Sequence, residues 1–232
     1  IASWDGARWR SMNIGMNGPV YALKVYNGEL YAGGNFNLAG TQTCSGIAKW
    51  DGNKWNKVGE GTAGGENTIY TLEVFNGELY AGGGFTIIGG ITARYLAKWN
   101  GSTWTETGGG VEDEVNGITS YKGELVVSGY FKHAGPEVNP VYVDRIAKFN
   151  GTAWQRMLTG MNDRVNTLFT FNGTDTVLYA GGEFSTAGGK WAFHSAKWGS
   201  FATSTVSGKV LYSDNNDTVR SGKVKILRMD LS

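Results

Sequence analysis

The chain has 232 residues, enough for one large β domain or two small ones, and its 21 basic and 20 acidic residues leave a net charge of +1. This balance excludes a broad electrostatic attraction to nucleic acid or to an anionic membrane surface. No apolar run approaches the length of a membrane-spanning helix, so we expect neither a nucleic-acid partner nor membrane insertion. The single cysteine, Cys44, excludes an internal disulfide framework.

A motif of nine residues returns along the chain at a nearly constant interval. Its first copy reads Ile-Ala-Ser-Trp-Asp-Gly-Ala-Arg-Trp, and the later copies keep the final Trp. Copies begin at Ile1, Ile47, Leu96 and Ile146, with a broken copy at Ser195, so the spacing is 46 to 50 residues. Several short strands repeated with a period near 50 are typical of propeller blades. We predict an all-β chain that forms a β-propeller of four-stranded antiparallel blades.

Each blade is expected to contain two hairpins. In the first copy, alternating apolar residues predict strand a at Val20–Tyr26 and strand b at Leu30–Phe36. Strands c and d are predicted at Ile47–Trp50 and Trp55–Val58. Asn-Gly or Asp-Gly pairs lie in the turns, at Asn27, Asn76 and Asn172 between a and b, and at Asp5, Asp51, Asn100 and Asn150 between c and d. Because these pairs tolerate positive φ at both central positions, we expect primed turns in both hairpins.

The repeats divide the chain into a propeller over residues 1–200 and a different unit after it. The predicted blades cover residues 20–58, 69–107, 115–157 and 165–198, and residues 1–12 are strands c and d of a preceding or closing blade. We expect about four and a half repeats of a longer propeller, with further blades from upstream sequence or another chain, because residues 195–198 already supply a strand c for the fourth a–b hairpin. A closed four-bladed ring is the alternative. Residues 206–232 show two alternating strands and predict a truncated β-sandwich-like domain.

The run Leu30-Tyr-Ala-Gly-Gly34, followed by Trp50 and Trp55, resembles the kelch and galactose-oxidase-like propeller repeats. The resemblance extends from Ile1 to about Trp198, although Ser-Gly replaces the glycine doublet in the third copy. Such repeats are found in secreted or surface-attached bacterial proteins, so the resemblance implies an extracellular or cell-surface location. It predicts the fold and leaves the function open, because related propellers host binding, adhesion and oxidase chemistry.

The connections between strands differ in how much they vary among copies. The b–c loops and the d–a linkers vary, whereas the two hairpin turns are nearly the same in each copy. Strand alternation places both variable connections at one end of the ring, which we take as the binding face. The candidate ligand-binding residues on this face are Trp191, Tyr142, Arg94, Tyr95, His133, His194, Glu112 and Asp113.

Most of the aromatic residues have a structural interpretation. Recurrence at one repeat position indicates blade packing for Trp9, Trp55, Trp104 and Trp154, and a core or inner-channel place for Tyr31, Tyr80 and Tyr179. Trp191 lies in a loop, and the other copies have no tryptophan near this position but carry Ser45, Arg94 and Asp144 instead. Because Trp191 is not part of the repeated packing, it could stack on a ligand.

Metal and catalytic motifs are scarce. His133 and His194 could bind copper, as in galactose oxidase, but the sequence shows no third ligand, so we expect no metal and no cofactor. The acidic run at Glu112, Asp113 and Glu114 is either a solvated loop or a contact for a cationic ligand. We find no nucleophile elbow, phosphate-binding loop or paired-cysteine zinc motif, and assign no catalytic residue.

These observations favour a non-enzymatic propeller module of an extracellular or cell-surface protein. It would act in adhesion, assembly or ligand binding, with a protein or glycan partner at the variable-loop face. The main alternative is a fragment of a propeller enzyme, galactose-oxidase-like or glycoside-cleaving, whose catalytic groups lie upstream. An intracellular kelch-like scaffold is a third possibility.

Overall fold

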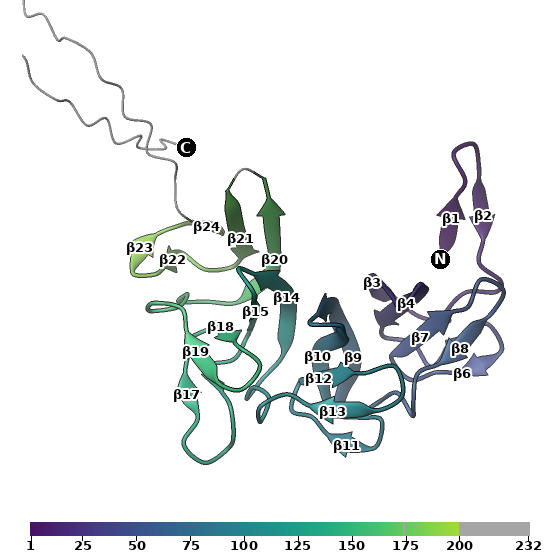
Figure 1. Cartoon of the computed structure of the whole chain (residues 1–232), viewed down its shortest axis with the longest axis horizontal. Helices are drawn as coiled ribbons and strands as arrows, with labels where there is room; N and C mark the ends of the chain where they lie inside the picture. Colours follow the sequence, from purple (N-terminus) through teal and green to yellow (C-terminus); the bar gives the residue numbers. More distant parts are fainter. Residues whose placement is uncertain (174, 200–232) are drawn as a thin grey trace, which may run out of the picture.

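The computed structural model describes residues 1–173 and 175–199, and every regular element in this part of the chain is a β-strand. The strands form antiparallel sheets that follow one another as the blades of a propeller (Figure 1). The predicted all-β propeller is therefore confirmed. The β-sandwich-like domain predicted for residues 206–232 lies outside the described residues.

The blades are built from consecutive stretches of chain. The first has the strand order β3 (Val20–Tyr26), β4 (Glu29–Gly34), β7 (Ile47–Trp50) and β8 (Trp55–Lys57). The second consists of β9 (Thr62–Phe75), β10 (Glu78–Ile88), β12 (Leu96–Trp99) and β13 (Trp104–Glu106), with β11 (Ile91–Thr92) on the end of β10. The third has β14 (Val115–Tyr121), β15 (Glu124–Gly129), β18 (Ile146–Phe149) and β19 (Trp154–Arg156). The described part of the fourth has β20 (Val165–Asn172), β21 (Thr176–Gly182) and β24 (Ser195–Trp198).

The b–c loops contain more structure than the sequence indicated. Three of them fold into miniature hairpins: β5 (Leu38–Ala39) with β6 (Gln42–Thr43), β16 (His133–Ala134) with β17 (Val141–Tyr142), and β22 (Thr186–Ala187) with β23 (Lys190–Trp191). Their strands are two residues long, too short to give an alternating pattern that sequence analysis could detect.

The turn between strands a and b has the expected geometry. Asn27 and Gly28 have φ angles of 50° and 79°, and Asn76 and Gly77 repeat them at 49° and 77°. Positive φ at both central positions defines the primed turn that matches the twist of the flanking strands. The prediction for these two turns is confirmed. The same prediction was wrong for Asn172 and Gly173, neither of which has a positive φ, because the connection between Asn172 and Thr176 is longer than a two-residue turn.

The turn between strands c and d differs from the prediction. Gly52 has a φ of 100°, but Asp51 is not among the residues with positive φ. Its carboxylate instead accepts hydrogen bonds from the backbone N–H groups of Asn53 and Lys54, each at 2.9 Å. The prediction of a primed turn here was wrong because Asp and Asn close this loop through their side chains rather than by adopting a left-handed conformation.

Three apolar clusters join successive blades. One contains Tyr31 and Ile47 of the first blade together with Leu72 and Trp104 of the second. Equivalent clusters join the second blade to the third and the third to the fourth. Trp55, Trp104 and Trp154 are buried, as predicted for blade packing. These cores fix each blade against its neighbour.

Two aromatic residues depart from the packing predicted for their repeat position. Trp9 is 69% exposed, whereas Trp55 at the same position is 1% exposed. Tyr179 is likewise exposed, whereas Tyr31 and Tyr80 are buried. The difference arises because, in the described residues, Trp9 belongs to a hairpin with no blade around it and Tyr179 to a blade with no neighbour beyond it. A repeat residue is buried only when the adjoining repeat covers it.

The described blades form an open arc. The N-terminal hairpin, β1 (Ala2–Trp4) paired with β2 (Trp9–Ser11), is a separate two-stranded sheet and does not join the sheet of β20, β21 and β24. In Figure 1 this hairpin and the fourth blade lie at opposite ends of the arc.

Candidate functional site

The variable connections meet at one end of the blades, as expected. Val111, in the linker before the third blade, forms a β-bridge with Ala134 in the b–c hairpin of that blade. The Glu112 carboxylate accepts a hydrogen bond from the backbone N–H of Lys132 at 2.7 Å. In the fourth blade, the Asn162 side chain accepts from the backbone N–H groups of Ser185 and Thr186. Linker and loop therefore form one surface in each of these blades.

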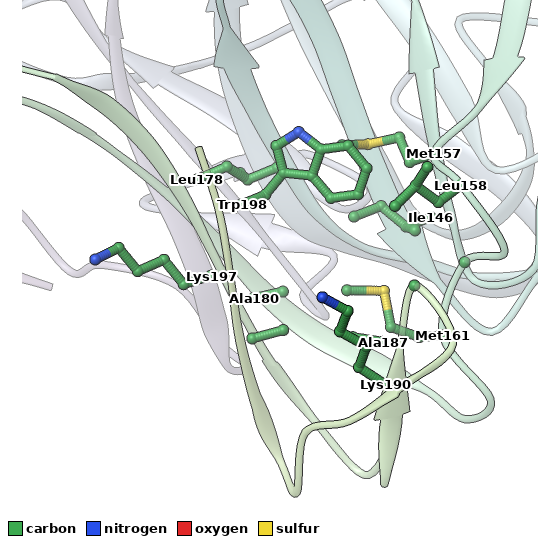
Figure 2. A pocket seen from close by; sticks show the side chains of 13 residues that line it. Ile146, Met157, Leu158, Met161, Leu178, Ala180, Ala187, Lys190, Lys197 and Trp198 are labelled. Carbon is green, nitrogen blue, oxygen red and sulfur yellow. The ribbon is translucent and has the colours of Figure 1, made fainter. Parts of the chain in front are cut away.

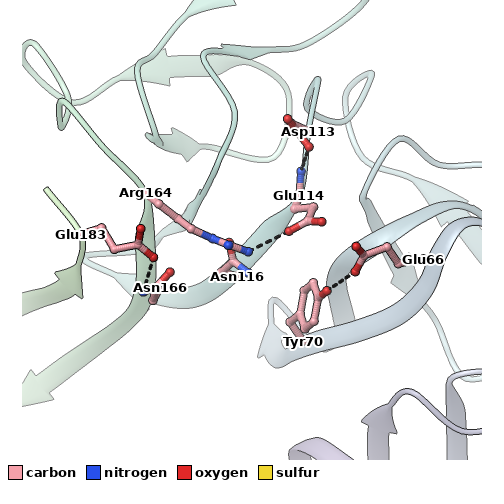
Figure 3. Close-up of polar contacts among 8 residues, drawn as sticks. All are labelled: Glu66, Tyr70, Asp113, Glu114, Asn116, Arg164, Asn166 and Glu183. Atoms are coloured by element: carbon pink, nitrogen blue, oxygen red, sulfur yellow. Dashed lines mark hydrogen bonds and ion pairs between the residues drawn. The ribbon is translucent and has the colours of Figure 1, made fainter.

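At this end a row of polar side chains lies along β9, around the beginnings of β14 and β20, and just after the end of β21 (Figure 3). The strands β9, β14 and β20 are the innermost strands of consecutive blades. We call this row of side chains the axial row; it consists of Glu66, Tyr70, Asp113, Glu114, Asn116, Arg164, Asn166 and Glu183.

Hydrogen bonds connect the axial row within and between blades. Arg164 Nη2 lies 2.8 Å from Glu114 Oε2, and its Nε donates to Asn116 Oδ1 at 3.2 Å, which joins the fourth blade to the third. Within the second blade, the Tyr70 hydroxyl donates to the Glu66 carboxylate. Side chains from three blades thus form one polar surface.

The electrostatics of the axial row are dominated by carboxylates. Burial, followed by the neighbouring charge of Glu66, raises the pKa of Glu114, and Arg164 only partly opposes this rise. Burial and the hydrogen bond to Glu66 raise the pKa of Tyr70. Four carboxylates share the row with one guanidinium (Figure 3). The surface therefore carries excess negative charge, and a cationic group placed there would relieve it.

Two of the sequence-predicted residues adjoin this row. Asp113 belongs to it, and its carboxylate accepts the backbone N–H of Glu114 at 2.8 Å. Tyr95 is half-buried, and burial, followed by the charges of Asp113 and Glu114, raises its pKa. The structure brings these two candidates together with Glu114.

Three other predicted residues form a cluster in the third blade. His133 Nδ1 lies 2.6 Å from Glu112 Oε2, and the His133 ring packs edge-on against Tyr142 with ring centroids 5.4 Å apart. Burial alone would raise the pKa of Glu112, but the backbone N–H of Lys132 and the His133 ring together lower it. The cluster leaves Tyr142 exposed on the b–c hairpin.

The remaining predicted residues are separate from both groups. Arg94 Nη1 donates to the carbonyl oxygens of Gly109 and Gly135, at 3.2 and 3.1 Å. This side chain therefore holds two loops of the next blade together, a structural role that the sequence analysis did not predict for Arg94. Trp191 stacks on Phe193, with centroids 5.7 Å apart, and both are exposed. His194 Nδ1 lies 3.2 Å from the carbonyl oxygen of Gly182.

Glu66, Tyr70 and Arg164 were missed by the sequence analysis. Tyr70, Asn116 and Asn166 each follow the first apolar residue of a predicted strand a, so they share one repeat position. That equivalence was available in the sequence, but their convergence depends on how neighbouring blades are placed.

Within residues 1–173 and 175–199, no group of three or more His, Cys, Asp and Glu side chains is placed to hold a metal ion. His133 and His194 lie in the b–c loops of different blades and have the separate partners described above. The same part of the chain contains no helix long and apolar enough to cross a membrane.

No family model matches the chain, and no curated protein matches it significantly. Among solved structures, it is similar to the computationally designed Ika4 protein, with 13% sequence identity, a TM-score of 0.48 and coverage of 81% of this chain and 94% of that one. It is also similar to the computationally designed Ika8 protein, with 15% identity, a TM-score of 0.45 and coverage of 72% of this chain and 45% of that one. The chain thus spans less than half the length of the Ika8 protein.

Proposed function

We propose that this chain is a non-catalytic binding module that takes a basic segment of a protein partner at its axial row. The observation that carries this proposal is the convergence of Glu66, Asp113 and Glu114 beside a single countercharge, Arg164. Asp113 and Glu114 are half-buried, whereas Glu66 is exposed beside them. Carboxylates that are partly removed from water and lie near another negative charge favour a bound cation more than isolated surface carboxylates do.

A protein partner fits the surroundings of the row. Exposed aromatic side chains lie in the b–c loops of the same end: Trp191 stacks on Phe193, and Tyr142 packs on the half-buried His133. Aromatic residues are enriched among those that contribute most to protein interfaces. An acidic centre flanked by aromatic residues suits a segment that carries Lys or Arg next to apolar side chains.

The test uses two acetylated, amidated tripeptides, Gly-Arg-Gly and Gly-Glu-Gly, titrated into the isotope-labelled chain and followed by NMR. We expect the basic peptide to shift the amide signals of Glu66 and Glu114, and the acidic peptide to leave them unchanged. Glu114→Gln should weaken binding of the basic peptide about fivefold, the effect of one partly exposed ion pair.

The matched control is Glu60→Gln, which removes the same charge from an exposed linker residue outside the axial row. It should leave binding of the basic peptide unchanged. Equal weakening by Glu60→Gln and Glu114→Gln would contradict the proposal, because binding would then follow net charge alone. Shifts at Trp191 and Tyr142 with neutral oligosaccharides, and none with the basic peptide, would favour a glycan partner instead.

From the sequence resemblance, we also propose that the protein is extracellular or attached to the cell surface. The same resemblance supports repeats of the kelch or galactose-oxidase-like kind. An enzyme fragment remains the second candidate from the sequence. An assay for turnover distinguishes the enzyme fragment from the binding module. Release of product from an oligosaccharide, or oxidation of galactose by the copper-loaded chain, would show that the chain is an enzyme and would overturn the binding-module proposal.

A further inference from the structure

Arg145 is a buried cation without a counterion in the described part of the chain. It is 8% exposed, its Nε is fully enclosed without a hydrogen-bond partner, and none of the ion pairs among the described residues includes it. The other described arginines all have a polar partner: Asp5 for Arg8 and Arg10, backbone carbonyl groups for Arg94 and Arg156, and Glu114 for Arg164. Burying a charge costs free energy that a bound counterion recovers, so an anionic ligand would stabilise Arg145.

Within the described residues, the guanidinium of Arg145 packs on the ring of Tyr130. Its Cζ atom lies 4.8 Å from the ring centroid, and Tyr130 itself is 49% exposed. Such a cation–π contact offsets only part of the free energy that a guanidinium loses with its water. The ring face accepts none of the five N–H donors in the way that an oxygen does, so the guanidinium keeps donors for a ligand.

The cavity beside β18 offers no counterion to Arg145. This cavity of about 200 Å³ lies between the third and fourth blades, and its lining includes Ile146, the residue that follows Arg145, together with Met157 (Figure 2). The charged side chains that line it are Lys190 and Lys197, and both are cations. The cavity therefore does not neutralise the guanidinium.

The fold does not require a long side chain at this position. Arg145 directly precedes strand c of its blade and has a φ of 72°, in the left-handed region that favours glycine. The equivalent residues of the other blades have similar φ angles, 70° at Gly46, 68° at Tyr95 and 61° at His194. In all four, the backbone N–H donates to the carbonyl oxygen of the phenylalanine that follows strand b. Because the first blade makes the same connection with a glycine, the arginine side chain is not needed to form it.

Arg145 lies close to the axial row, at the end of the third blade where the variable loops and linkers meet. The backbone N–H of Tyr130 donates to the carbonyl oxygen of Glu114, and that of Gly129 donates to the carbonyl oxygen of Arg145, each at 3.0 Å. Glu114, Tyr130 and Arg145 thus lie at the same end of three neighbouring strands, β14, β15 and β18. Because neighbouring strands are about 4.8 Å apart, about 10 Å separates the backbones of Glu114 and Arg145. A negative and a positive group therefore lie side by side.

We propose that Arg145, stacked on Tyr130, binds a carboxylate of the same partner segment whose basic residue lies on the axial row. This inference rests on the proposed function and specifies the segment further: an acidic residue lies two positions from the basic one. In an extended chain, residues i and i+2 face the same side about 7 Å apart, and long side chains cover the remaining distance. Glu114 and Arg145 then each meet the opposite charge, which fixes the direction in which the segment binds.

A carboxylate suits this place better than a phosphate group. Its two oxygens match the planar fork of N–H donors on a guanidinium, and it carries a single negative charge. A phosphorylated side chain carries about 1.5 to 2 negative charges at pH 7. The nearby carboxylates of Asp113 and Glu114 would repel that larger charge more strongly.

The test compares two acetylated, amidated pentapeptides, Gly-Arg-Gly-Glu-Gly and Gly-Arg-Gly-Gln-Gly, which differ in a single charge. Each is titrated into the isotope-labelled chain, and NMR follows the amide signals of Glu66 and Glu114 and the side-chain Nε–Hε signal of Arg145. Both peptides should shift the signals of Glu66 and Glu114, and only the glutamate peptide should shift that of Arg145. The glutamate peptide should bind about tenfold more tightly, the effect expected for hydrogen bonds between charged groups.

Arg145→Gln should remove the difference in affinity between the two peptides, since the neutral side chain no longer pairs with the glutamate. Arg8→Gln is the matched control and should keep the difference. It removes the same charge from the turn between β1 and β2, where the Arg8 side chain is 71% exposed. The peptide comparison itself uses the unaltered chain, so it tests the proposal without depending on how either variant folds.

The contrary results separate this inference from the proposed function. Equal affinity for the two peptides, with shifts at Glu66 and Glu114, would overturn the role of Arg145 and leave the proposed function standing. Loss of the difference in Arg8→Gln as well would show that binding follows net charge, which also overturns that role. A shift of the Arg145 signal alone would overturn the proposed function and leave a separate carboxylate site, and no shift at any of the three residues would overturn both.

Discussion

Trp154 donates its indole N–H to the carbonyl oxygen of Gly108, 3.0 Å away, and so ties the last strand of the third blade to the linker that leaves the second. Trp104 makes the equivalent bond to Val58 one blade earlier. The bond satisfies a buried donor while the ring fills the space between blades. These tryptophans therefore contribute to the stability of the propeller through packing between neighbours, beyond the stability of their own sheets.

Truncating these tryptophans should have effects that depend on position. Trp104→Ala should lower the free energy of unfolding by about 3–5 kcal/mol, since it removes a buried aromatic side chain and leaves a cavity. Trp9→Ala, at the same repeat position, should change it by less than about 0.5 kcal/mol, because Trp9 is exposed. Urea denaturation followed by circular dichroism measures both. Similar losses in the two variants would show that Trp9 is packed in solution.

The second glycine of each glycine pair has a packing reason. A Cβ on Gly182 would clash with the carbonyl oxygen of Arg164, whereas a Cβ on Gly181 would lie 3.2 Å from the Thr167 methyl group and 3.9 Å from the carbonyl oxygen of His194. Gly182→Ala should therefore destabilise the chain by about 1–3 kcal/mol, the cost of overpacking against backbone.

Gly181→Ala is the control for this prediction, with a smaller expected loss because the Thr167 side chain can move. Thermal unfolding of the two variants makes the comparison. The same contact explains why the third copy keeps Gly129 although Ser128 replaces the first glycine: a Cβ on Gly129 would clash with the carbonyl oxygen of Glu114.

The turn between β7 and β8 should respond to pH through Asp51. Hydrogen bonds from the backbone N–H groups of Lys54 and Asn53 lower the pKa of its carboxyl to about 2, from a usual value of 3.8. A folded-state pKa below the unfolded one gives stability that is present above pH 4 and is lost as the pH falls toward 2.

Asp51→Asn should remove this part of the acid sensitivity, because Asn100 and Asn150 accept the same backbone bonds without a charge. The difference in unfolding free energy between the parent chain and Asp51→Asn should shrink between pH 4 and pH 2, as measured by urea titrations at each pH. A constant difference would contradict the assigned role of Asp51.

The exposed aromatic residues of the b–c hairpins should be dispensable for folding. Trp191 and Tyr142 are 77% and 46% exposed, so replacing either with Ala should change the unfolding free energy by less than about 0.5 kcal/mol. Differential scanning calorimetry checks this, and the same variants should bind a protein partner less well. A large loss of stability would assign these residues to the framework instead.

Local patterning in the sequence was enough to predict most of the blade. The alternating residues of Val20–Tyr26 and the positive-φ turn at Asn27 and Gly28 depend on neighbours along the chain, and both agree with the structure. The turn at Asp51 was wrong because the same residue pair closes a loop in two ways. Only the structure, which shows the hydrogen bonds of the Asp51 side chain, distinguishes the two kinds of turn.

The sequence by itself determined the β-propeller, its period and the end at which variable loops gather, because hydrophobic alternation and turn residues act over a few positions and recur in each repeat. Only the tertiary structure decided which equivalent residues are buried and which side chains meet across blades. Trp9 and Trp55 share a motif, yet one is exposed and the other buried; Arg164 reaches Glu114, fifty positions away in sequence. Burial and charge pairing depend on the neighbouring blade, which a repeat motif does not encode.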